Sequence, residues 1–210
     1  MRILFLMFFA GLLAGCIGNP PRTTVPVLHD LGEAGSGGKP PGLPIASLEV
    51  KAASWLSSSG QVYRLLYADP LQRHVFLESR WAAPPAELIE RLLQRRIIFS
   101  QPDTPGQGCR LSLQLDELEQ RFETADVSKL VLDVRAQLLS ARGDSVLGRR
   151  AFVIERPAKA SDARGGVLAA REAVADLTDE LGAWLSSLAR DRPQAAAGCK
   201  PRESSAEKRR

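Results

Sequence analysis

Regular spacing of apolar residues predicts most of the secondary structure of this chain. Alternation of apolar and polar positions, with a period of two, is typical of strands that bury one face. It is clearest at Leu111, Leu113 and Leu115, whose neighbours are polar. Six segments show this alternation or the β-branched and aromatic composition that favours strands: residues 47–52, 61–67, 74–81, 111–115, 130–138 and 146–155.

Two further segments show the helical period. Pro84 and Pro85 favour a helix start, and an apolar stripe follows over residues 88–93. A longer stripe recurs at helical spacing between residues 167 and 188. The element order is therefore βββαβββα, which predicts an α+β fold: an antiparallel sheet with two helices packed on one face. We expect the last three strands to form an antiparallel meander.

The first sixteen residues predict export and a lipid anchor. Arg2 precedes a run of 13 apolar or small residues, which as a helix reaches roughly 20 Å and is too short for the roughly 30 Å hydrocarbon core. This pattern is typical of a signal peptide, which we assign to residues 1–15. The segment Leu13-Ala14-Gly15-Cys16 resembles the bacterial lipobox, so we expect a lipid anchor on Cys16. The alternative is an ordinary signal peptide with an incidental cysteine.

Composition divides the rest of the chain into three parts. Residues 16–44 are rich in Gly and Pro and predict a flexible tether, residues 45–189 form one domain, and residues 190–210 predict a disordered basic tail. The tail holds seven basic and three acidic side chains, so it accounts for the net charge of +4. With Arg2 also set aside, the remainder is close to −1. Nucleic acid is not an expected partner, because an exported chain without a platform of stacking aromatics does not suit one.

The residues that could carry chemistry do not form a recognisable catalytic or metal-binding motif. His29 and His74 stand apart, although a metal site needs three or four ligands. Asp116, Glu117 and Glu119 lie along one expected strand and are interpreted as a solvated face. We therefore expect no enzyme activity, no cofactor and no metal.

Two cysteines remain once Cys16 is lipidated. Cys109 and Cys199 can pair in an oxidising periplasm, and the bond would fix the basic tail to the strand near Cys109. The alternatives are two free thiols or a bond between chains.

Residues 62–70 (Val-Tyr-Arg-Leu-Leu-Tyr-Ala-Asp-Pro) and 79–89 (Ser-Arg-Trp-Ala-Ala-Pro-Pro-Ala-Glu-Leu-Ile) resemble the ABC-type transport auxiliary lipoproteins, the PqiC-like family. The resemblance implies a non-enzymatic docking component of an MCE/ABC lipid transport system. The implied partners are an MCE-domain periplasmic protein and its ABC transporter, with a ring-forming homo-oligomer as a further expectation. Because Ile17 rather than Asp follows the anchor, the outer membrane is favoured over the inner membrane. The alternative function is a structural or assembly lipoprotein that binds the cell wall or another envelope machine.

Arg80 and Trp81 lie where a predicted strand is followed by a predicted helix. Two interpretations remain open. Trp81 packs the helix against the sheet while Arg80 pairs with Glu87 or Glu90, or both residues form a partner surface, since Arg and Trp are enriched at interfaces.

Overall fold

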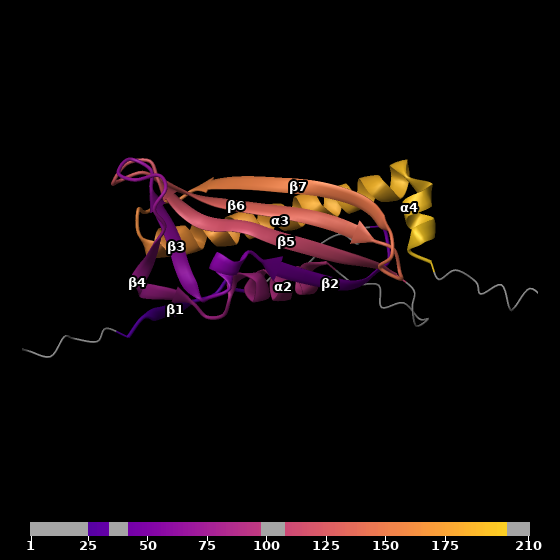
Figure 1. Cartoon of the computed structure of the whole chain (residues 1–210), viewed down its shortest axis with the longest axis horizontal. Helices are drawn as coiled ribbons and strands as arrows, with labels where there is room; N and C mark the ends of the chain where they lie inside the picture. The colour runs from indigo at the N-terminus through magenta and orange to yellow at the C-terminus, as the bar shows by residue number, and fades with distance from the viewer. Residues whose placement is uncertain (1–24, 34–41, 98–107, 201–210) are drawn as a thin grey trace, which may run out of the picture.

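The computed structural model describes residues 25–33, 42–97 and 108–200 of the chain. Within these ranges, seven strands form one sheet, and the two long helices lie on one of its faces (Figure 1). The elements are β1 (Val27–His29), β2 (Ile45–Ala52), the short 3-10 helix η1 (Ser54–Leu56), β3 (Gly60–Leu65), β4 (His74–Trp81), α2 (Pro85–Arg96), β5 (Cys109–Phe122), β6 (Ser128–Leu139), β7 (Val146–Pro157), α3 (Ala163–Asp191) and α4 (Pro193–Gly198). This confirms the α+β fold.

The sheet is organised around β5. The strand order is β1-β4-β3-β5-β6-β7, and β2 also pairs with β5. The three long strands β5, β6 and β7 form the expected antiparallel meander. The pairs β2–β5 and β3–β5 are parallel, however, as is β1–β4. The strands β2 and β3, of eight and six residues, follow each other along one edge of the 14-residue β5, and both run parallel to it.

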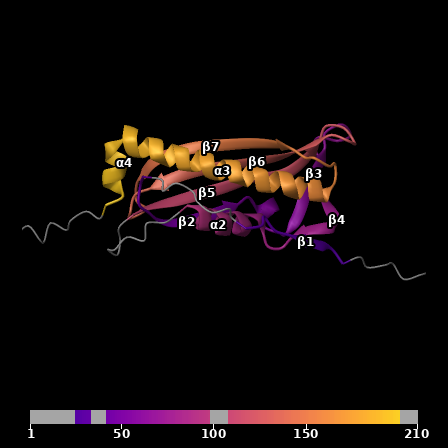
Figure 2. The same cartoon turned by 180° about the vertical axis from the view of Figure 1, so that it is seen from behind.

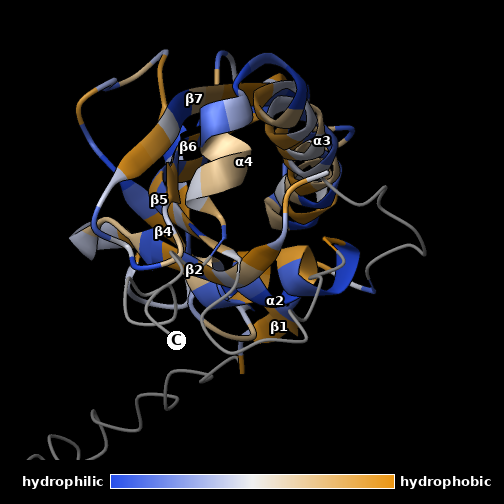
Figure 3. Ribbon diagram, turned by 90° about the vertical axis from the view of Figure 1, so that its right-hand side faces the viewer, coloured by the Kyte–Doolittle hydropathy of each residue, from blue (hydrophilic) through white to orange (hydrophobic). Residues whose placement is uncertain are grey.

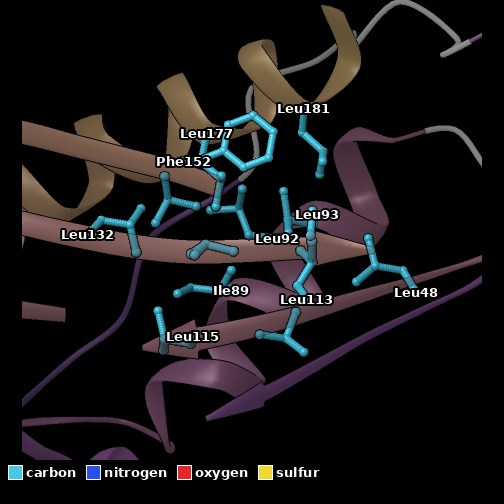
Figure 4. Packing of buried hydrophobic residues seen from close by; sticks show 14 of the residues in the cluster. Leu48, Ile89, Leu92, Leu93, Leu113, Leu115, Leu132, Phe152, Leu177 and Leu181 are labelled. Atoms are coloured by element: carbon cyan, nitrogen blue, oxygen red, sulfur yellow. The ribbon is translucent and has the colours of Figure 1, made fainter. Parts of the chain in front are cut away.

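Both long helices bury an apolar stripe against the same face. From behind, α3 runs the length of the sheet over β6 and β7, and α2 lies below it beside β2 (Figure 2). Seen along the long axis, the two helices occupy one side of the sheet and turn hydrophobic residues toward it (Figure 3). The core that results includes Ile89 and Leu93 of α2, Leu113 of β5, and Leu177 and Leu181 of α3 (Figure 4).

Side chains of α2 complete the free edge of β2. The carboxylate of Glu90 accepts a hydrogen bond from the Val50 N–H at 2.8 Å, and the Gln94 amide donates to the Leu48 carbonyl at 3.5 Å. An open strand edge invites pairing with another chain. These two contacts therefore satisfy edge groups of β2 without a further strand.

Regular structure extends beyond residues 45–189 at both ends. In the segment that was expected to be a tether, Val27–His29 form β1 and Leu31 is buried. In the segment that was expected to be a tail, α3 continues to Asp191 and α4 spans Pro193–Gly198. A three-residue strand is too short to show periodicity, and the Pro- and Ala-rich α4 resembles a linker in composition. The predicted signal peptide and Cys16 lie outside the described residues.

Candidate functional site

The face of the sheet opposite α3 holds a buried carboxylate. Gln120 of β5 points toward α3, where it closely approaches Gly166, so its neighbour Glu119 points to the other face. The Glu119 side chain is nevertheless fully buried. The expectation that Glu119 belongs to a solvated face is therefore wrong. The β-bulge between Leu115 and Glu117 turns it away from the core, and side chains from other elements then cover it.

Three arginines surround this carboxylate. Glu119 Oε2 lies 3.2 Å from Nη2 of Arg64 and 3.7 Å from Nη1 of Arg73, and Oε1 lies 2.6 Å from Nε of Arg121. Arg64 and Arg121 face each other across the β3–β5 pair, so strand register brings them to the same place. A buried charge must be paired to be tolerated, and here cations from β3, the β3–β4 loop and β5 all contribute.

Arg73 connects this network to an exposed tryptophan. Its guanidinium donates to both carboxylate oxygens of Glu117, at 2.9 and 2.5 Å. The same guanidinium lies over the Trp55 ring, 5.1 Å from the centroid, a cation–π contact. Hydrogen bonding to Glu117 raises the pKa of Arg73, with burial acting in the opposite direction, so the group stays charged. We call Trp55, Arg73, Glu117, Glu119, Arg64 and Arg121 the Trp55–Arg73 platform.

The platform combines exposure with a fixed geometry. Trp55 is 51% exposed, whereas its partner Arg73 is fixed in place by the carboxylates of Glu117 and Glu119. Trp and Arg are the residues most enriched among side chains that dominate binding energy at interfaces. A rigid pair loses little conformational freedom when a partner binds. This arrangement suits recognition of another protein.

The surrounding face carries both signs of charge. Burial, reinforced by the nearby charges of Asp116 and Glu117, raises the pKa of Asp133 above the ordinary aspartate value. Arg135 pairs with Asp116, with Nη2 to Oδ1 at 2.7 Å. The mixture gives a patterned rather than a uniformly charged surface, which favours a specific partner over a general polyanion.

The structure separates the two residues that the sequence put forward as a partner surface. Trp81 is only 4% exposed and belongs to the hydrophobic core, so it packs the sheet against the helices. Arg80 is exposed and lies opposite Leu28 of β1. The two carboxylates expected to pair with it have other partners: Glu87 pairs with Arg91, and Glu90 caps β2.

Cys109 and Cys199 are joined in a disulfide, with their Cα atoms 4.5 Å apart. Both residues are fully buried at the end of the molecule where α4 lies (Figure 1). The Gly108 N–H donates to the Cys199 carbonyl at 2.8 Å, and the Ala141 N–H donates to the Gly198 carbonyl at 3.1 Å. The end of α4 is thereby fixed to the start of β5 and to the β6–β7 turn.

The histidines of the described segments serve packing and strand pairing. The His74 ring stacks on Tyr63 with centroids 5.0 Å apart, and His29 pairs with Trp81 in the β1–β4 register. Among the described residues, no group of three His, Cys, Asp or Glu side chains is arranged to hold a metal ion. The described helices also include none that is long and apolar enough to cross a membrane.

Sequence reasoning missed the platform because its members come from separate elements. Trp55 precedes the polar stretch Ser57-Ser58-Ser59-Gly60, an unusual setting for a core tryptophan, and this was the available signal. Its partnership with Arg73 depends on how η1 and the β3–β4 loop meet over β5. No local pattern encodes that meeting.

Two solved structures are similar in fold to this chain. One is a Xanthomonas campestris protein of the DUF330 family, with a TM-score of 0.62 and 18% identity, covering 80% of this chain and 99% of that one. The other, described as an uncharacterized protein, has a TM-score of 0.61 and 13% identity, covering 77% of this chain and 99% of that one. At these identities the likeness concerns the fold. No curated protein matches the chain.

The family comparison is decisive. The model of the ABC-type transport auxiliary lipoprotein component matches residues 32–182, which include the whole platform and most of α3. The DUF330 proteins belong to this same family. The chain belongs to the family of ABC-type transport auxiliary lipoprotein components.

Proposed function

We propose that this protein is a membrane-anchored lipoprotein that acts as a non-enzymatic docking component of an MCE-type ABC lipid transport system between the inner and outer membranes. The observation that carries the proposal is the family match over residues 32–182. The family is described as an auxiliary component of ABC-type transport, so the role we assign is binding rather than catalysis. Lipidation of Cys16 supplies the anchor, and Ile17 at the next position favours the outer membrane.

We assign the contact with the MCE-domain protein to the Trp55–Arg73 platform. An exposed Trp stacked by an ion-paired Arg combines apolar area with directed hydrogen-bonding capacity. The network beneath it ties β3, the β3–β4 loop and β5 together, so the platform moves little on binding. Truncation of such an anchor costs about 2 kcal/mol or more of binding free energy, which corresponds to about 30-fold in affinity.

The experiment is isolation of the lipidated protein from membranes, followed by mass spectrometry of the proteins that accompany it. The wild-type protein is expected to bring down an MCE-domain protein and an ABC permease. The Trp55→Ala variant is expected to lose most of both. The matched control is Val153→Ala, which removes another exposed apolar side chain from the same face, on β7. Unchanged thermal midpoints of the two variants would show that the fold is intact.

The outcome also tests the alternative of a structural or assembly lipoprotein. Recovery of cell-wall material or of an unrelated envelope machine, without MCE or ABC components, would contradict transport. Equal recovery by the Trp55→Ala and Val153→Ala variants would leave transport in place and remove the platform as the contact.

A further inference from the structure

Exposed large apolar side chains gather at one end of the described molecule. Of the twelve such residues in the described ranges, eight lie in the segment around β1, in β4, or in the β3–β4 and β5–β6 connections: Val25, Val27, Leu28, Tyr67, Leu71, Val75, Leu77 and Val127. Leu71 and Leu77 are 88% and 85% exposed. We call these eight residues the apolar end. Figure 1 shows its elements opposite the end that carries α4.

The local structure does not protect this end from contacts. Edge strands of soluble proteins are commonly guarded by charged side chains, but β1 consists of Val27, Leu28 and His29. In β4 the pairing register with β3 is interrupted, and Leu77 falls in the interrupted part. A concentration of exposed apolar residues on a folded domain marks an interaction site.

The chain enters the described structure at this same end. Val25 is nine residues from Cys16, and a chain of that length spans at most about 32 Å when fully extended. A lipid on Cys16 therefore keeps the apolar end within a short distance of the bilayer surface. The other end, with the disulfide and α4, has no such restriction.

We infer that the apolar end rests on the surface of the membrane that holds the anchor, so that its leucines and valines enter the interfacial region of the lipid. The inference depends on the lipidation of Cys16 in the proposed function. Apolar side chains gain free energy when they leave water for the acyl boundary. Because the anchor makes this contact intramolecular, a weak intrinsic affinity suffices, as it does for any second site on a short tether.

The contact differs in kind from adsorption of a basic segment. The exposed charges of this end include Glu78 and Arg80 on β4 and three acidic side chains in the two connections, Asp69, Glu123 and Asp126, so the end has no net positive charge. The interaction is therefore driven by apolar burial, and salt should not weaken it. The long axis of the domain then points away from the membrane, and α4 projects toward the periplasm.

The experiment uses the full lipidated chain in vesicles of phosphatidylethanolamine and phosphatidylglycerol. An environment-sensitive fluorophore is placed on a single new thiol by Leu77→Cys, and in a matched control by Val153→Cys on β7, which is 63% exposed. Flotation with the vesicles first establishes that the anchor is present. Failure to float would count against the proposed anchor alone. Among proteins that float, we expect a blue shift and quenching by brominated lipid at position 77, with neither at position 153.

A second variant tests the apolar contribution directly. Leu28→Ser together with Leu71→Ser, in the protein labelled at position 77, is expected to lower the ratio of docked to undocked protein at least about tenfold. The thermal midpoint of the exposed double variant serves as the folding control. High salt should not weaken the wild-type signal.

Three results would overturn the inference. These are no quenching at position 77, equal quenching at both positions, or a blue shift at position 77 that is already present without vesicles. The last result would assign the apolar end to contact with another protein chain.

Discussion

Removal of the Cys109–Cys199 disulfide should lower the stability of the domain substantially without changing its fold. The perturbation is the double substitution Cys109→Ala and Cys199→Ala, compared with the oxidised wild-type protein. The bond joins the first residue of β5 to the residue after α4. The hydrogen bonds of Gly108 and Ala141 to the end of α4 remain available without it, so the native arrangement should persist.

The magnitude follows from the size of the closed loop. The two cysteines are 90 residues apart. In the chain-entropy model a loop of this length restricts the unfolded state by about 4.6 kcal/mol at 25 °C. For a protein of this size, each kcal/mol changes the thermal midpoint by roughly 2–4 °C, so the expected loss is about 9 to 18 °C.

The assay is thermal denaturation of both proteins, with and without reductant, beside a count of free thiols in the unreduced, unfolded protein. Because both cysteines are fully buried, reductant should act only once the protein opens. We expect no free thiol at these positions in the wild-type protein. Reductant should not change the stability of the double variant. Two free thiols, or a wild-type midpoint unaffected by reduction, would refute the reasoning.

Three further predictions concern α3 and the sheet. Gly165→Ala should destabilise the protein by about 2 kcal/mol or more, since the new Cβ would lie 1.9 Å from the Ala160 carbonyl oxygen. Gly182 lies in the same helix with open space around it, so Gly182→Ala should stabilise the protein by about 0.5 to 1 kcal/mol. Urea denaturation checks both, and equal effects would contradict the geometry. Asp162→Ala should cost about 1 kcal/mol, because the Asp162 carboxylate accepts the Gly165 N–H at the start of α3, and Asp162→Asn should retain most of that stability.

The pKa of Asp133 is raised by burial, so ionised Asp133 opposes folding above its folded pKa. Asp133→Asn should therefore raise the thermal midpoint at neutral pH, and the gain should fade as the pH falls below the ordinary aspartate pKa, where the carboxyl is protonated in both states. A gain that does not depend on pH would refute this.

The parts of the fold that were predictable have strong local signals. Alternation along the β5–β6–β7 meander marks one face as buried, and Pro84 with Pro85 marks the start of α2. The parallel pairing of β2 and β3 with β5 was not predictable, because it depends on which edge of β5 two separate strands occupy, and no local pattern encodes that. The same holds for β1, which has too few residues for a period.

The candidate site was less predictable than the fold. Sequence reasoning left two interpretations open for the adjacent Arg80 and Trp81, packing or a partner surface, and the burial of Trp81 agrees with packing. The Trp and Arg that contact each other are the exposed Trp55 and the half-buried Arg73, 18 positions apart in the chain. Glu119 illustrates the same difficulty. Its outward direction depends on the β-bulge between Leu115 and Glu117, and its burial depends on arginines from β3, the β3–β4 loop and β5.

The central claim is that the Trp55–Arg73 platform of a membrane-anchored lipoprotein contacts an MCE-domain protein. The most direct measurement is photo-crosslinking in cells, with a photoreactive phenylalanine analogue at position 55 and, separately, at position 153 on the same face. The account predicts a crosslink to an MCE-domain protein from position 55 and none from position 153. Crosslinks from position 55 to other proteins only, or equal crosslinks from both positions, would contradict it.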